Sequence, residues 1–155
     1  MQHLGPASVT VRPGVSLVYE LLGDAAGQGI VVMHGGQSGR HESRRFALAL
    51  AAAAEAAGVP VRILIHDRRN MGASSVAFGD ASERGLPEEE AEDLHLLLQS
   101  LRLGPCICMG SSSGARTSLL LALAHPADVA GLVLAPPTGG GATSPVSIEN
   151  LARNY

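Results

Sequence analysis

Short apolar runs alternate with helix-like segments along most of this chain. The apolar runs cover residues 29–36, 61–67, 106–110 and 130–137, and the helix-like segments cover residues 44–58, 87–104 and 113–126. Parallel strands need a crossover connection, and a helix between successive strands supplies it. The alternation therefore predicts an α/β fold in which a mostly parallel sheet carries helices on both faces.

Two further strands are predicted before this alternation begins. Residues 8–23 read "SVTVRPGVSLVYELLG", and the pair Pro13-Gly14 marks a turn in the middle. Together with the later apolar runs they predict about six strands in all. A chain of 155 residues suits a single domain that can bury a sizeable core.

The composition disfavours several classes of protein. Hydrophobic residues make up 46% of the chain and charged residues 16%, and the formal net charge is -3. The longest basic clusters are the pairs Arg44-Arg45 and Arg68-Arg69, so we expect no nucleic-acid partner. No apolar run approaches the ~20 residues of a membrane span, and no secretory signal is visible. We therefore expect no membrane partner and a cytoplasmic location.

No cofactor and no metal site are expected. Cys106 and Cys108 share one face of a predicted strand, and free cysteines in such places are usually small core residues. The histidines lack a two-His helical spacing, and neither a Walker motif nor a Gly-x-Gly-x-x-Gly that opens a helix is present. The acidic run from Glu88 to Glu90 predicts a solvated helix start.

The segment Gly110-Ser111-Ser112-Ser113-Gly114 lies between a predicted strand and a predicted helix. This is the context that a Gly-x-Ser-x-Gly nucleophile elbow requires, because the two glycines permit a very tight turn. The turn places Ser112 at its tip, so Ser112 is the candidate nucleophile. The backbone N–H of Ser113 belongs to the helix N-terminus and is a candidate oxyanion donor. The side chains of Ser111 and Ser113 are interpreted as structural.

A second loop, His34-Gly35-Gly36, follows an earlier strand and can bring another backbone N–H beside the elbow. Gly36 is the first choice for this oxyanion donor, and Gln37 is the second. His34 is interpreted as a core histidine that fixes the loop.

These two motifs resemble the oxyanion loop and the nucleophile elbow of the α/β-hydrolase family, close to its proline iminopeptidase and epoxide-hydrolase-like branches. Between them lies a segment similar to the family's D-x-R-G-x-G-x-S turn, matched by Asp67, Arg69, Met71, Gly72 and Ser74. Asn70 replaces the usual glycine there, and asparagine tolerates a left-handed backbone better than most residues. The resemblance covers residues 9–141.

The resemblance implies a serine hydrolase that acts on a small-molecule substrate. In such an enzyme Ser112 attacks an acyl carbon, the amides of Gly36 and Ser113 hold the oxyanion, and water then releases the acyl group. Ester, amide and carbon–carbon bonds all suit this scheme, and no substrate-binding residue is assigned. The alternative is a non-catalytic module that binds a ligand on the same fold without turnover.

The resemblance also implies that part of the fold is missing. Residues 1–141 match the N-terminal part of the hydrolase core, truncated after about six strands. Residues 142–155 resemble the start of the lid helix that usually follows the sixth strand, with an apolar stripe of Ile148, Leu151 and Tyr155. We therefore expect the chain to end inside that helix, to be inactive alone, and to self-associate through an exposed sheet edge.

The order of the triad in this fold is Ser, acid, His, so both partners of Ser112 should follow it. Residues 136–144 contain no acid, and the next one, Glu149, falls in the expected lid helix. His125 is the single later histidine, and it ends a helix that carries it about 18 Å from the elbow. The triad acid and histidine are therefore expected beyond residue 155.

The histidines before Ser112 do not occupy the family's position for the base. His66 ends a strand just before the Asp67 turn and is interpreted as structural. His41 follows the oxyanion loop and is interpreted as facing the pocket. If the chain alone were active, His41 and His66 would be the residues to test as the base.

Overall fold

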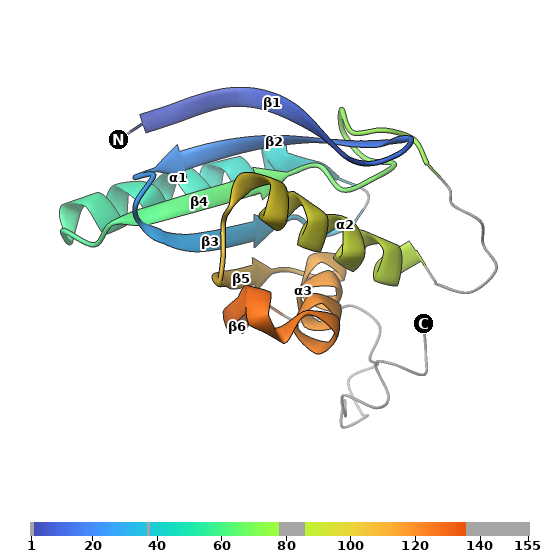
Figure 1. Ribbon diagram of the computed structural model, residues 1–155. Helices are drawn as coiled ribbons and strands as arrows, with labels where there is room; N and C mark the ends of the chain where they lie inside the picture. The colour runs from blue at the N-terminus through green and yellow to red at the C-terminus, as the bar shows by residue number, and fades with distance from the viewer. Residues whose placement is uncertain (1, 37, 78–85, 136–155) are drawn as a thin grey trace.

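The computed structural model describes residues 2–36, 38–77 and 86–135 (Figure 1). They form a six-stranded sheet with the strand order β1-β2-β4-β3-β5-β6. The strands are β1 (Gln2–Arg12), β2 (Val15–Gly23), β3 (Gln28–Met33), β4 (Val61–His66), β5 (Cys106–Gly110) and β6 (Val129–Leu134). The helices are α1 (Arg40–Ala56), α2 (Leu86–Leu101), α3 (Ser113–Ala124) and the short 3-10 turn η1 (Pro126–Asp128).

The predicted fold class is confirmed. β4, β3, β5 and β6 run parallel to one another, whereas the β1–β2 hairpin and the β2–β4 pair are antiparallel. β1 begins six residues before the predicted start at residue 8, because its pairing with β2 extends to Gln2 opposite Gly23. The expected lid helix, residues 142–155, lies outside the described residues.

Helices cover both faces of the sheet, with α1 on one face and α2 and α3 on the other (Figure 1). The pleat divides the strand side chains between two cores. On β4, for example, Ile63 and Ile65 pack in the core under α1, whereas Leu64 packs in the core under α2 and α3. This division explains why the central strands read as continuous apolar runs.

The face of α2 that meets the sheet is the apolar stripe that its sequence predicts. Ala91, Leu94 and Leu98 are buried, together with Leu97, and Leu101 packs against the same core. The expectation that residues 88–90 form a solvated start is wrong for Glu90, which is only 3% exposed. An arginine from the β4–α2 connection reaches this carboxylate, as described below.

Both cysteines are free core residues, as their spacing predicts. Cys106 and Cys108 are fully buried on the same face of β5. Burial raises the pKa of the Cys106 thiol to about 11 and that of the Cys108 thiol to about 12, so both are protonated at neutral pH. Neither thiol is therefore a candidate nucleophile.

Helix α1 begins at Arg40, whereas its sequence pattern predicts a start at residue 44. The reason is a contact with a distant part of the chain: the backbone N–H of Arg40 donates to the carboxylate of Asp67 at 2.6 Å. A side chain from the end of β4 thus satisfies a donor of the first turn, and no local cap is needed.

The topology points to one edge of the sheet as the place for chemistry. β3 and β5 are neighbours, but β3 leads into α1 on one face and β5 leads into α3 on the other. In open α/β sheets the crevice outside the carboxyl ends of two such strands is the usual ligand site. Within the described residues, no helix combines the length and apolar character that a bilayer crossing requires.

Candidate active site

The elbow at the end of β5 has a strained backbone at its tip. Ser112 precedes α3 as its N-cap with φ 53° and ψ -121°, a conformation that residues other than glycine rarely adopt. Such strain costs on the order of 1–3 kcal/mol and is concentrated at functional sites. The structure thus places Ser112 at the tip of the turn between β5 and α3.

Both glycines of the elbow are sterically required. A Cβ atom on Gly110 would lie 2.4 Å from the carbonyl oxygen of Gly114. A Cβ atom on Gly114 would lie 2.6 Å from the carbonyl oxygen of His34. These distances are well below van der Waals contact, so only glycine permits α3 to pack this closely on β5 and on the loop after β3.

The loop that follows β3 lies directly beside the elbow. A Cβ atom on Gly35 would lie 3.0 Å from the Cβ atom of Ser112 and 3.1 Å from the carbonyl oxygen of Ser111. Gly36 is exposed and has φ 54°, with open space where a side chain would be. The structure therefore brings together Gly36, Ser112 and Ser113, whereas Gln37 lies outside the described residues.

Arg68 holds this loop against the elbow, and sequence reasoning missed it. Its Nη2 atom donates to the carbonyl oxygen of Gly36 at 2.6 Å and to Oγ of Ser113 at 3.0 Å. Its Nη1 atom donates to Glu90 on α2 at 2.7 Å, and both side chains are 2% exposed. Thr117 on α3 donates to the same carboxylate at 3.1 Å. One buried ion pair thus joins the His34-Gly35-Gly36 loop, the turn before α3 and α2.

The Asp67 turn provides the frame for Arg68. The carboxylate of Asp67 accepts the N–H of Ala73 at 2.9 Å in addition to that of Arg40, and its carbonyl accepts the hydroxyl of Ser74 at 2.7 Å. Burial alone would raise the pKa of Asp67, but these N–H groups and the charge of Arg40 outweigh it and lower the pKa. The carboxylate is therefore a structural anion.

The left-handed backbone of the same turn restricts which residues can occupy positions 70 and 72. Asn70 has φ 63°, so the expectation that asparagine tolerates a left-handed conformation here is confirmed. Its side-chain oxygen also accepts the N–H of Ala77 at 2.6 Å. Gly72 has φ 55°, and a Cβ atom there would lie 2.3 Å from Cγ of Asp67.

Arg69 joins the turn to α2 through Asp93. Its Nε atom donates to Oδ2 of Asp93 at 2.5 Å, and its Nη2 atom donates to Oδ1 at 2.8 Å.

The two buried histidines near the site are poor bases. His34 is buried and contacts the carbonyl of Gly35 at 3.2 Å, and burial together with the charge of Arg68 lowers its pKa. His66 is buried as well, and burial, His34 and Arg68 lower its pKa to about 3. Both agree with the structural roles expected of them.

The other two histidines discussed above lie away from the elbow or at the surface. His41 is exposed in the first turn of α1, and His125 lies at the opposite end of α3 from Ser112.

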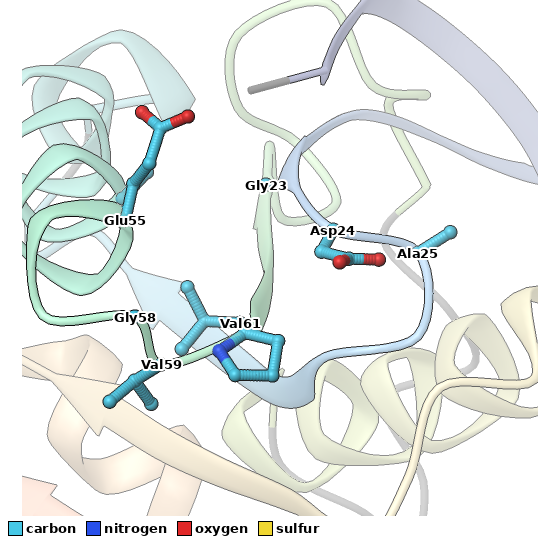
Figure 2. Close-up of a pocket in the computed structure, with 9 residues that line it drawn as sticks. Gly23, Asp24, Ala25, Glu55, Gly58, Val59 and Val61 are labelled. Atoms are coloured by element: carbon cyan, nitrogen blue, oxygen red, sulfur yellow. The ribbon is translucent and has the colours of Figure 1, made fainter.

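A cavity of about 320 Å³ adjoins the elbow at the carboxyl ends of β3, β5 and β6. Its lining is mainly apolar: Val32, Met33, His34, Glu42, Ser43, Phe46, Met109, Gly110, Ser111, Val133 and Ala135. A larger cavity of about 570 Å³ lies at the other end of the strands, with Asp24 and Glu55 on opposite sides (Figure 2). The smaller cavity reaches the elbow through Gly110 and Ser111, whereas the larger one lies away from it, so the smaller one is the candidate substrate site.

Known proteins share this fold and part of this sequence. The alpha/beta hydrolase family matches residues 30–154. The sn-1-specific diacylglycerol lipase ABHD11 of Mus musculus is 35% identical over 140 residues, which cover 90% of this chain and 42% of that relative.

Solved structures of hydrolases have the same fold. A hydrolase from Pseudomonas aeruginosa PA01 aligns with a TM-score of 0.71 and 27% identity over 84% of this chain and 45% of that chain. Epoxide Hydrolase A from Mycobacterium thermoresistibile aligns with a TM-score of 0.70 and 23% identity over 84% of this chain and 38% of that chain, a likeness of fold. This chain thus spans less than half the length of each relative. The family match covers most of its residues, and the chain belongs to the alpha/beta hydrolase family.

Proposed function

We propose that this chain carries the nucleophile and the oxyanion hole of a serine hydrolase. The observation that carries the proposal is the strained backbone of Ser112, at the N-terminus of α3 and in contact distance of the His34-Gly35-Gly36 loop. In this scheme Oγ of Ser112 attacks the acyl carbon, and the N–H groups of Ser113 and Gly36 stabilise the oxyanion. The leaving group departs to give an acyl-enzyme, which water hydrolyses.

The base and the acid of the triad are proposed to come from residues that follow this segment. The lowered pKa of His66, about 3, makes it too weak a base to activate a serine at neutral pH. His125 is separated from Ser112 by the whole length of α3. The matched residues cover 42% of the relative from Mus musculus and 45% of the hydrolase from Pseudomonas aeruginosa, so the rest of those proteins has room for both groups.

We propose carboxylic esters with an apolar acyl chain as the substrate class. The cavity beside the elbow supports this choice, because Val32, Met33, Phe46, Met109 and Val133 offer it an apolar wall. The relative from Mus musculus is named as a diacylglycerol lipase, which is an esterase of the same chemical class.

The test is made in the full-length protein that carries this segment, with p-nitrophenyl esters of increasing acyl length. Ser112→Ala should abolish turnover, because loss of a triad nucleophile lowers kcat by about 10⁶-fold in the best-measured serine protease. Ser111→Ala is the matched control and should leave most of the activity. A Ser112→Ala variant that retains activity, or a Ser111→Ala variant that loses it, refutes this assignment of the elbow.

The alternative function is binding without turnover, and one observation favours it for the chain by itself. Both buried histidines near the elbow have lowered pKa values, so the described residues offer Ser112 no strong buried base. The discriminating measurement is ester turnover by the full-length protein. If the ester binds saturably and its concentration stays constant over hours, the binding module replaces the hydrolase.

A further inference from the structure

Four ionisable side chains gather where α2 meets the end of α3, away from the elbow. Glu92 and His95 belong to α2, His125 follows α3, and Asp128 belongs to η1. We call them the His95–His125 cluster. Nε2 of His125 lies 2.9 Å from Oε2 of Glu92, and Nδ1 of His95 lies 2.6 Å from Oδ2 of Asp128. The two imidazole rings stack in parallel, with centroids 3.7 Å apart and an angle of 4° between their planes.

We propose that the His95–His125 cluster is a zinc site with Glu92, His95 and His125 as ligands. Their ligand atoms all lie within 4.8 Å of one another. Two donors at a tetrahedral zinc ion, each about 2.1 Å from the metal, lie about 3.4 Å apart. Because the two stacked rings lie in parallel planes, at least one imidazole must turn out of the stack so that both nitrogen lone pairs point to one ion. A water molecule can complete the coordination.

The hydrogen bond between His95 and Asp128 prepares one imidazole for this role. A carboxylate oxygen can only accept, so Nδ1 of neutral His95 carries the proton and Nε2 carries the lone pair. A carboxylate that holds the other nitrogen of a ligating histidine fixes the ring and raises its basicity toward zinc. Gln99 in turn holds Asp128, with Nε2 donating to Oδ1 at 3.2 Å.

The chemistry of the donors favours zinc over magnesium or calcium. Two imidazole nitrogens and a carboxylate oxygen are ligands that zinc prefers, whereas magnesium and calcium take oxygen ligands. Binding needs no redox step: the ion displaces the proton that His125 shares with Glu92, and that proton moves to Nδ1 of His125. His95 and His125 each keep 23% of their side-chain surface exposed, so an ion has access from solvent.

A bound ion would fasten α2 to the end of α3, in addition to the hydrogen bonds that already join them. Glu92 and His95 lie at i and i+3 on one face of α2, and His125 comes from the end of α3, just before η1 and β6. The ion would thus tie the helix that begins at the elbow to its neighbour. This role is independent of the proposed hydrolysis, because the cluster and Ser112 lie at opposite ends of α3.

Equilibrium dialysis of the tag-free 155-residue chain against zinc tests the proposal, since it counts bound metal per chain whatever the oligomeric state. We expect one zinc ion per chain, with an affinity that falls at lower pH because the ligating nitrogens must be unprotonated. His125→Gln and His95→Gln should each remove the ion, and Asp128→Asn should weaken binding by about 10–100-fold. His41→Gln, at an exposed histidine of α1, is the control and should change nothing.

Cobalt(II) titration adds a spectroscopic measurement, because a tetrahedral site gives strong visible absorption and loosely bound surface ions do not. Far-UV circular dichroism of the variants verifies that glutamine, which can still hydrogen-bond to Glu92 or Asp128, preserves the helices. No bound zinc in the folded chain overturns the proposal. So does binding that persists in the double variant His95→Gln/His125→Gln, or that is lost equally in His41→Gln.

Discussion

The backbone conformation of Gly36 determines the shape of the His34-Gly35-Gly36 loop. Its φ of 54° favours glycine, yet a Cβ atom there would meet nothing within 4 Å. A side chain at this position is therefore excluded by the backbone conformation and not by packing. The carbonyl oxygen of the same residue accepts a hydrogen bond from Arg68, which holds this end of the loop in place.

We predict that Gly36→Val lowers turnover of activated esters by about 10²-fold or more in the full-length protein, because the loop rotates and one oxyanion donor is displaced. Gly58→Val is the matched control. Gly58 has φ 68° and also has nothing within 4 Å of a Cβ atom, but it follows α1 at the other end of the strands. Both variants should lose similar thermal stability, and only Gly36→Val should lose activity. Equal activity in the two variants would remove Gly36 from the proposed role.

At the scale of elements, the Arg68–Glu90 pair is the link that joins the β4 turn, α2 and the elbow. Ion pairs this deeply buried are expensive to break, because the remaining partner is left charged and without its counter-ion. The pair also explains the burial of Glu90, which the acidic run in the sequence does not suggest. Its position next to Ser113 and Gly36 couples the stability of α2 to the geometry of the proposed oxyanion hole.

Arg68→Met should lower the free energy of unfolding by about 3–5 kcal/mol, measured by urea denaturation, because Glu90 becomes an unpaired buried charge. The double variant Arg68→Met/Glu90→Leu should recover a large part of that loss. Arg44→Met is the control: it breaks an ion pair between Glu20 and a side chain that is 44% exposed, and should cost about 1 kcal/mol or less. A double variant no more stable than Arg68→Met alone would contradict this account.

At the scale of the whole molecule, the described sheet ends in an apolar edge. β6 pairs with β5 and, within the described residues, with no strand on its other side. Leu132, Val133 and Leu134 are large apolar side chains that remain exposed on it. An unprotected apolar edge strand presents free N–H and C=O groups that can pair with another chain.

We predict that the 155-residue chain self-associates at micromolar concentration in size-exclusion chromatography with light scattering. Val133→Lys should shift the distribution toward the monomer, because a charge on the edge opposes strand pairing. Val59→Lys is the control, since Val59 is 53% exposed and Val133 is 50% exposed, but Val59 lies outside the strands. A monomeric wild-type chain, or equal shifts in both variants, would show that the edge is not the contact.

The sequence by itself determined the order of the elements, the two-sided sheet and the position of the elbow. These features depend on short stretches of sequence, because apolar periodicity and glycine spacing involve residues only a few positions apart. The spacing of Gly110 and Gly114 is enough to predict the sharp turn, and Asn70 in place of a glycine is enough to predict a left-handed residue in the Asp67 turn.

Only the tertiary structure decided which polar side chains meet. Arg68 lies 22 positions from Glu90, 32 from Gly36 and 45 from Ser113, and Asp67 lies 27 positions from the N–H group of α1 that it caps. His125 likewise reaches Glu92 across 33 positions. No local pattern encodes such pairs, because they form only when parallel strands bring their carboxyl ends to one edge and helices pack on the same face. From the sequence, a charged residue is therefore predicted to be exposed to solvent. Only the folded structure identifies the distant partner that allows it to be buried.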